Sequence, residues 1–232
     1  MHVTAPAGHD RRRPIIAPTA VLFDLDGTLV DSAPAILAAL SATFAELGMP
    51  EPTDAELMRF VGPPLVDGFR MHAGLTGQAN TEAVATYRRH YRKTMLDSPL
   101  YDGVAELVRA LHAAGIPLAL ATSKHEGYAR EILEHTGLLD CFTVVSGAGS
   151  GDVGGRKAEV IRSALQRLAA TGADLRRPIH VGDLDHDVQG ARDEGVDCIG
   201  ALWGYGDAQT LRGAIALAAA PAELGALFGV EN

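Results

Sequence analysis

The sequence predicts an α/β fold: a doubly wound parallel sheet with a helical cap inserted after its first strand. From residue 99 onward, short apolar runs alternate with helical patterns. Residues 32–98 break this alternation, since they contain several helical patterns and no convincing strand. Strands that alternate with helices imply crossover connections, and these produce parallel sheets covered by helices on both faces.

The first strand is predicted at Ala20–Phe23, an apolar run that ends abruptly at Asp24. A short run followed by Asp and Gly is typical of a buried strand that feeds a loop. Three similar runs follow at Pro117–Ala121, Phe142–Val145 and Pro178–Val181, and a weaker one lies at Asp197–Gly200. We therefore expect a sheet of at least these strands.

Amphipathic helices lie between these strands. Their apolar residues repeat at i, i+3, i+4 and i+7, and glycine marks each end, as is common for helix C-termini. The stripes begin at Val104, Ala129 and Val160 and end near Gly115, Gly137 and Gly172. This alternation indicates a Rossmann-like core, which we assign to residues 19–31 and 99–232.

The inserted segment, residues 32–98, is predicted to be a second, helical unit. Ile36, Leu40 and Phe44 share one face of a helix that ends at Gly48. Further helical stretches are expected at residues 56–61, 66–74 and 81–96, with prolines between them. Because the insertion follows the first strand, we expect it above the carboxyl end of the sheet, where open parallel sheets bind ligands.

Composition limits the class of protein. The chain has 232 residues, 47% of them hydrophobic, enough for a full core and a smaller lobe. Its net charge of −9 argues against nucleic-acid or anionic-membrane partners, which need clustered Lys and Arg. Cys141 and Cys198 lack CxxC spacing and suit a reducing compartment, and no apolar run approaches the ~18 residues of a membrane span. We expect a cytoplasmic monomer or homodimer with no nucleic-acid or membrane partner.

Residues 1–18 precede the first strand. They contain a basic triplet followed by Ile15 and Ile16, but Pro14 and Pro18 interrupt the apolar run. A secretory signal peptide needs a continuous apolar region, which is lacking here. We expect residues 1–18 to form a mobile N-terminal extension.

Two carboxylates follow the first strand. Asp24 and Asp26 are two residues apart, and in extended backbone such side chains point the same way. Gly27 allows the chain to turn sharply after them. Two carboxylates at one ligand can divide the roles of nucleophile, metal ligand and proton carrier. The alternative is a pair of loop aspartates that cap a turn.

Thr122, Ser123 and Lys124 follow the second strand. A hydroxyl at such a junction can bind a phosphate oxygen, while the next helix supplies backbone amides. The alternative is that a hydroxyl only caps that helix.

A third polar group follows the strand at Pro178–Val181. Asp183 and Asp187 offer the oxygen ligands that Mg²⁺ prefers. We expect Asp185 to cap the following helix and His186 to be a solvated partner of the neighbouring acids, with a ligand role as the alternative for His186. Because the carboxyl ends of parallel strands share one edge of a sheet, all of these groups are expected to converge.

The segment Gly147–Gly155 is rich in glycine and leads into Arg156 and Lys157. It is not a Walker motif, because no GK[ST] follows. Its cations are candidates to neutralise a phosphate at the neighbouring strand ends. The register of the helix stripe favours Lys157, and Arg156 is the alternative.

These motifs resemble those of the haloacid dehalogenase superfamily, and within it the phosphoglycolate phosphatase branch. Phe23–Ser32 (FDLDGTLVDS) is similar to the first family motif and Ala121–Lys124 to the second. Lys157 corresponds to the third, although this branch commonly has Lys-Pro there, and Gly182–Asp187 to the GDxxxD fourth. The insertion also stands where one cap class of the family has its cap.

The resemblance implies roles for individual residues. Asp24 is expected to attack phosphorus and become an aspartyl-phosphate, and Asp26 to protonate the leaving oxygen and then activate water. Thr122 and Lys157 are expected to stabilise the phosphoryl group. The remaining implied contacts are Gly27, Thr28, Ser123 and Lys124 to the substrate, and Asp24, Asp26, Asp183 and Asp187 to Mg²⁺.

The predicted function is therefore Mg²⁺-dependent hydrolysis of a small phosphorylated metabolite, with phosphoglycolate as one candidate. A phosphosugar mutase of the same fold and a non-catalytic phosphate-binding module are the alternatives. The cap loop Val61–Pro64 and the basic stretch Tyr87–Lys93 are candidates to meet the far end of the substrate. A solvated helix face is the other interpretation of the basic stretch.

Overall fold

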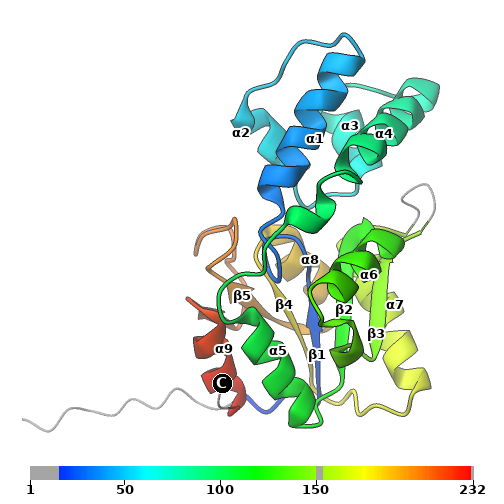
Figure 1. Cartoon of the computed structure of the whole chain (residues 1–232). Helices are drawn as coiled ribbons and strands as arrows, with labels where there is room; N and C mark the ends of the chain where they lie inside the picture. The colour runs from blue at the N-terminus through cyan, green and yellow to red at the C-terminus, as the bar shows by residue number, and fades with distance from the viewer. Residues whose placement is uncertain (1–15, 150–153, 231–232) are drawn as a thin grey trace, which may run out of the picture.

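The computed structural model describes residues 16–149 and 154–230 (Figure 1). Within them, the chain forms a parallel sheet of six strands in the order β3-β2-β1-β4-β5-β6. The strands are β1 (Ala20–Phe23), β2 (Leu118–His125), β3 (Val144–Ala148), β4 (Pro178–Gly182), β5 (Asp197–Ala201) and β6 (Ala216–Ala218). The predicted doubly wound parallel sheet is confirmed.

Three strand predictions needed correction. The second strand continues through His125 instead of ending at Ala121, and its pairing with β3 is irregular between these two residues. The third strand begins at Val144, two residues later than predicted, because Phe142 directly follows a 3-10 turn. The short sixth strand was not predicted: it lies in the apolar run 214–220, which is mostly alanine, a residue that does not favour strands.

Helices cover both faces of the sheet. They are α5 (Val104–Ala113), α6 (Glu126–His135), α7 (Lys157–Ala170), α8 (Asp185–Asp193) and α9 (Pro221–Phe228). Because side chains alternate along a strand, Val21 and Phe23 pack with α5, α6 and α9, whereas Ala20 and Leu22 pack with α7 and α8. The completely buried β1 is therefore held between two apolar layers.

The cap lies above the carboxyl end of β1 (Figure 1). It contains α1 (Ala33–Glu46), α2 (Asp54–Leu57), α3 (Leu65–His72) and α4 (Gly77–Tyr91), with 3-10 turns at Met58–Phe60 and Met95–Asp97. Its helices share an apolar cluster of their own, in which the rings of Phe44, Phe60 and Phe69 have centroids 5.3–6.1 Å apart. We infer that residues 32–98 form a domain with its own core.

The segment before β1 is held in place at its described end. Ile16 is buried, and its backbone N–H donates to the carbonyl of Leu227 at 2.6 Å. The expectation of a mobile extension is wrong for Ile16, and residues 1–15 lie outside the described residues. None of the helices in the described part of the chain is long and apolar enough to span a bilayer.

Candidate active site

The loop after β1 is held in a tight turn against β4. The N–H of Asp24 donates to the carbonyl of Val181 at 2.9 Å, which fixes the start of the loop in register with the sheet. Gly27 then adopts φ +84°, and a Cβ there would lie 2.2 Å from Oδ2 of Asp183. Both the left-handed backbone and the close approach require glycine at this position.

Lys157 lies between two buried carboxylates. Its Nζ is 2.7 Å from Oδ1 of Asp24 and 2.9 Å from Oδ1 of Asp187, and it donates to the carbonyl of Ala121 at 3.2 Å. Burial alone would lower the pKa of Lys157, but the two carboxylates outweigh it and raise that pKa. Lys157 is therefore a fixed cation at the carboxyl end of β1.

Of the two candidate cations, only Lys157 is brought to these carboxylates. Its side chain is 3% exposed, whereas that of Arg156 is 72% exposed and lies 3.9 Å from Asp67 on the cap. Part of the glycine-rich segment before them, residues 150–153, lies outside the described residues. Lys157, the residue favoured by the register of the apolar helix stripe, is thus the cation that reaches Asp24 and Asp187.

Asp187 connects Lys157 to the first turn of α8. Its Oδ2 accepts from the N–H groups of Asp183 and Leu184 at 3.1 Å each, and its Oδ1 lies 3.0 Å from Nε2 of His180. Burial would raise the pKa of Asp187, but Lys157 and His180 together hold it below its ordinary value. The expectation that Asp185 caps this helix is wrong: Leu184 occupies the N-cap, and Asp187, the third residue of the helix, accepts its N–H.

Asp183 is buried beside the other two acids. Its Oδ1 accepts from the hydroxyl of Thr28 and its Oδ2 from the N–H of Tyr205, both at 2.9 Å. Burial, together with the charges of Asp187 and Asp24, raises the pKa of Asp183 to about 7. Three buried carboxylates thus converge on one region, and Lys157 neutralises only part of their charge.

One group of side chains here could hold a divalent cation, and it includes His186 but not the predicted ligand Asp183. Asp24, His186 and Asp187 each offer a ligand atom, and these atoms lie within 4.8 Å of one another. Mg²⁺ takes oxygen ligands and is held by one or two carboxylates together with substrate oxygens. His186 pairs loosely with Asp185, at 3.6 Å, while its Nε2 is buried without a hydrogen-bond partner in the described part of the chain.

Asp26 faces the cap instead of the buried acids. Its Oδ1 accepts from the hydroxyl of Ser32 at 2.5 Å and lies 3.0 Å from Nζ of Lys124. Thr122, just before Lys124, is buried, and its hydroxyl accepts from the N–H of Lys124 at 3.2 Å. The predicted motifs at the ends of β1 and β2 therefore meet at Asp26.

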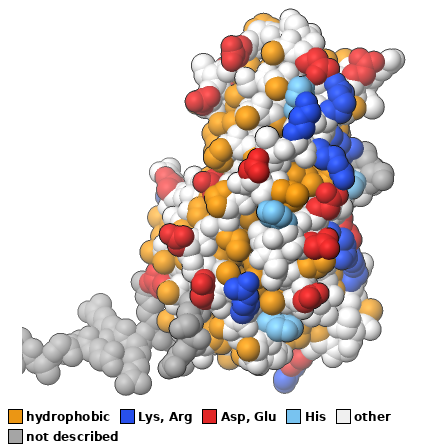
Figure 2. Space-filling model, viewed as in Figure 1, with side chains coloured by type: hydrophobic (Ala, Val, Ile, Leu, Met, Phe, Trp, Pro, Cys, Tyr) orange, Lys and Arg blue, Asp and Glu red, His pale blue; other side chains and the backbone are white. Residues whose placement is uncertain are grey.

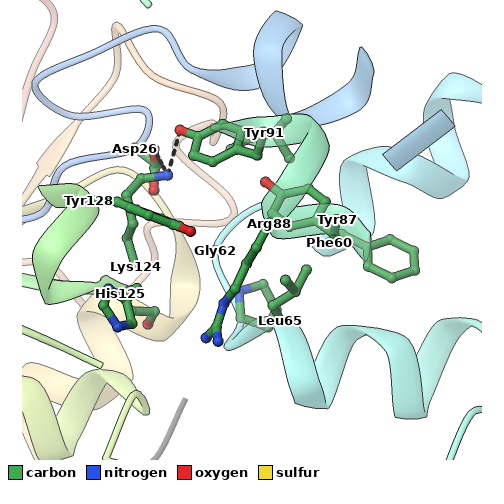
Figure 3. A pocket seen from close by; sticks show the side chains of 13 residues that line it. Asp26, Phe60, Gly62, Leu65, Tyr87, Arg88, Tyr91, Lys124, His125 and Tyr128 are labelled. Carbon is green, nitrogen blue, oxygen red and sulfur yellow. Dashed lines mark hydrogen bonds and ion pairs between the residues drawn. The ribbon is translucent and has the colours of Figure 1, made fainter. Parts of the chain in front are cut away.

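A pocket opens between Asp26 and the cap (Figure 3). Its walls combine a few charged groups with several rings. The core contributes Asp26, Ser123, Lys124, His125 and Tyr128, and the cap contributes Ile36, Phe60, Gly62, Pro63, Leu65, Tyr87, Arg88 and Tyr91. Of the predicted cap loop, Gly62 and Pro63 thus face the pocket.

The basic stretch at the end of α4 is divided between pocket and surface. Tyr87 and Arg88 line the pocket, whereas Arg89 pairs with Glu46. Figure 2 shows Lys and Arg side chains gathered along one side of the cap. Arg89 thus fits the interpretation as a helix face outside the pocket, whereas a contact of Tyr87 and Arg88 with the substrate stays a prediction.

Tyr205, which no sequence pattern indicated, joins the site to the cap. Its N–H binds Asp183, and its hydroxyl accepts from the N–H groups of Ser32 and Ala33 at 2.9 Å each. The same hydroxyl donates to Asp31 at 3.1 Å. This tyrosine follows β5, far along the chain from the segment it holds.

The chain is similar to known proteins over the region that contains these motifs. Residues 21–201 match the family model of haloacid dehalogenase-like hydrolases. A tyrosine-protein kinase PtkA of Mycobacterium tuberculosis is 40% identical over 83% of this chain, and the match spans 65% of that relative's length. A 5′-nucleotidase of Pseudomonas aeruginosa is 37% identical over 83% of this chain and 86% of the relative.

A phosphoglycolate phosphatase of Agrobacterium fabrum is 34% identical, and the match covers 83% of each chain. The crystal structure of a predicted phosphatase from Clostridium acetobutylicum superposes with a TM-score of 0.80 at 31% identity, covering 87% of this chain and 94% of that one. The order of the motifs, the fold and these relatives agree, and the chain belongs to the family of haloacid dehalogenase-like hydrolases.

Proposed function

We propose that the protein is a Mg²⁺-dependent phosphatase that hydrolyses a small phosphate monoester through an aspartyl-phosphate on Asp24. The observation that carries this proposal is the position of Asp24: its carboxylate lies 2.7 Å from the buried ammonium of Lys157, and Asp26, two residues on, opens into a pocket. A nucleophile and a proton carrier on one loop are what a two-step phosphoryl transfer needs.

In the first step, a carboxylate oxygen of Asp24 attacks phosphorus, and the bond from phosphorus to the ester oxygen breaks. Asp26 gives its proton to that leaving oxygen. In the second step, Asp26 takes a proton from water, the water oxygen attacks the same phosphorus, and Asp24 is released with inorganic phosphate. Splitting the hydrolysis through a covalent intermediate replaces one difficult step by two easier ones.

The surrounding groups provide charge and orientation. Lys157 is proposed to offset negative charge at Asp24 and the phosphoryl oxygens, and Thr122 to donate to one of those oxygens. Asp24 and Asp183, with the backbone carbonyl of Asp26 and with Asp187, are proposed to hold Mg²⁺. When bound, this ion would reduce the repulsion between the anionic nucleophile and the anionic phosphate, the main requirement of phosphoryl transfer.

The pocket supports two substrate classes. Arg88 is suited to a carboxylate, as in phosphoglycolate, the substrate named for the Agrobacterium fabrum relative. The rings of Tyr87 and Tyr128 suit a planar base, as in a nucleotide, the class suggested by the name 5′-nucleotidase of the Pseudomonas aeruginosa relative. The acidic composition and the two free thiols support a cytoplasmic setting.

A panel of phosphate monoesters, assayed with Mg²⁺ and with a chelator, tests the proposal. We expect release of inorganic phosphate only with the metal, and a loss of at least ~10³-fold in Asp24→Asn, because a covalent nucleophile is removed. Phosphate release that survives this substitution would contradict the mechanism. An isomerised product without phosphate release would indicate a mutase, and wild-type protein inert toward every ester would favour a binding module.

A further inference from the structure

A tyrosine of the cap reaches across to the core beside Asp26. Tyr91 is the last residue of α4, and its hydroxyl accepts from Nζ of Lys124 at 2.8 Å (Figure 3). The same Nζ lies 3.0 Å from Oδ1 of Asp26 and 4.4 Å from the centroid of the Tyr91 ring. One ammonium group therefore connects the cap to the acidic loop after β1.

These contacts are shielded from water. Tyr91 is 1% exposed, and the side chain of Lys124 is 7% exposed. Burial and the charge of Asp26 raise the pKa of Tyr91 well above its ordinary value, so its hydroxyl remains protonated. Polar contacts in such a low-dielectric site are stronger than at the surface. The side chain of lysine is flexible, so these contacts are what hold Lys124 in one orientation.

The contacts of Asp26 are asymmetric. In the described part of the chain, its carboxylate contacts Ser32 and Lys124, and both bind Oδ1. This leaves Oδ2 for proton transfer. Ser32 and Asp26 belong to the same short segment, so Lys124 is the partner whose position the cap controls.

We propose that Tyr91 is a positioning residue: from the cap, it holds Lys124 against Asp26 and so fixes the orientation in which Asp26 protonates the leaving oxygen. The inference rests on the proposed function, in which Asp26 carries that proton. It makes the acid step depend on the cap covering the core, because only then does the Tyr91 hydroxyl reach Lys124.

The test is the dependence of Tyr91→Phe on the leaving group. An alkyl phosphate releases a strongly basic alkoxide and needs the proton, whereas p-nitrophenyl phosphate releases a weakly basic phenolate and does not. General acid catalysis contributes about 10²–10⁴-fold, so partial loss of orientation is expected to lower kcat/KM for the alkyl ester by about 10-fold and for the aryl ester by less than about 2-fold. The ratio kcat/KM reports the first half-reaction and is therefore the quantity to compare.

The phenylalanine variant keeps the ring that stacks on Tyr87, with centroids 5.4 Å apart, so folding is expected to be retained. Tyr87→Phe, one helical turn earlier, is the matched control, and it should change both esters by the same factor. Lys124→Met is a second variant: if Tyr91 acts through Lys124, adding Tyr91→Phe to it should have no further effect on the contrast between the esters.

Asp26→Asn is the reference for the proposed function and should show a larger contrast between the two esters. If it does, and Tyr91→Phe affects both esters equally or neither, the inference about Tyr91 is wrong while the acid role of Asp26 stands. If Asp26→Asn shows no contrast, that acid role fails, and the inference fails with it.

Discussion

Replacing Lys157 by methionine should destabilise the protein strongly. The ammonium lies 2.7 Å from Asp24 and 2.9 Å from Asp187. At an effective dielectric constant of about 20, each pair corresponds to about 6 kcal/mol of Coulomb attraction, from which the cost of burying the ammonium must be subtracted. Removing one partner of such a buried group leaves the others uncompensated, at a net cost of about 3–5 kcal/mol.

For a chain of 232 residues, this corresponds to a melting temperature lower by roughly 10 °C. Thermal unfolding in chelator, followed by circular dichroism at neutral pH, measures it. The two carboxylates can be protonated, so the difference from wild type should shrink as the pH is lowered toward about 5. Arg156→Met is the control and should cost less than about 0.5 kcal/mol, because that side chain is exposed. A Lys157→Met melting temperature within about 2 °C of wild type would refute this reasoning.

Three further predictions concern the surroundings of the site. Gly27→Ala should lower the free energy of unfolding in urea by about 2–4 kcal/mol, because it adds a clash to a left-handed backbone. The control Gly48→Ala, with a left-handed backbone but open space around it, should lower it by only about 1–2 kcal/mol. Equal costs would contradict this reasoning. Since the pKa of Asp183 rises from 3.8 to about 7 on folding, the metal-free protein should lose stability as the pH rises between these values. Mg²⁺ should restore the lost stability at about pH 8. A metal-free protein with a higher melting temperature at pH 8 than at pH 5 would contradict this. Tyr205→Phe should destabilise by about 1–2 kcal/mol, because the first amides of α1 lose their acceptor, and an unchanged urea midpoint would show that water replaces it.

The sequence was most informative where one local rule decides the structure. The run Ala20–Phe23 became a strand with the predicted bounds, because four apolar residues ended by an acidic turn leave few alternatives. The topology then brought Asp24, Lys157 and Asp187 together, because the carboxyl ends of parallel strands share one edge. The sequence alone therefore predicted that the motifs converge, but not the distances between their side chains.

Contacts set by tertiary packing could not be predicted. Tyr205 binds the start of α1 from a loop that follows β5, and Tyr91 reaches Lys124 from the end of a cap helix. In the sequence, neither tyrosine can be told apart from a tyrosine that is simply buried in the core. Asp187 is the partner of the two amides just before α8, and this also depends on its burial against Lys157, which propensity does not reveal.

The central claim is that Asp24 carries the phosphoryl group during turnover. The most direct measurement is rapid acid quench of the enzyme with its best ester and Mg²⁺, followed by peptide mass spectrometry. We predict the mass of one phosphoryl group on Asp24, labile to hydroxylamine as an acyl phosphate and absent from Asp24→Asn. A phosphoryl group on another residue would contradict the account. So would turnover at full rate with no phosphoryl group trapped on Asp24, under conditions in which the acyl phosphate forms faster than it is hydrolysed.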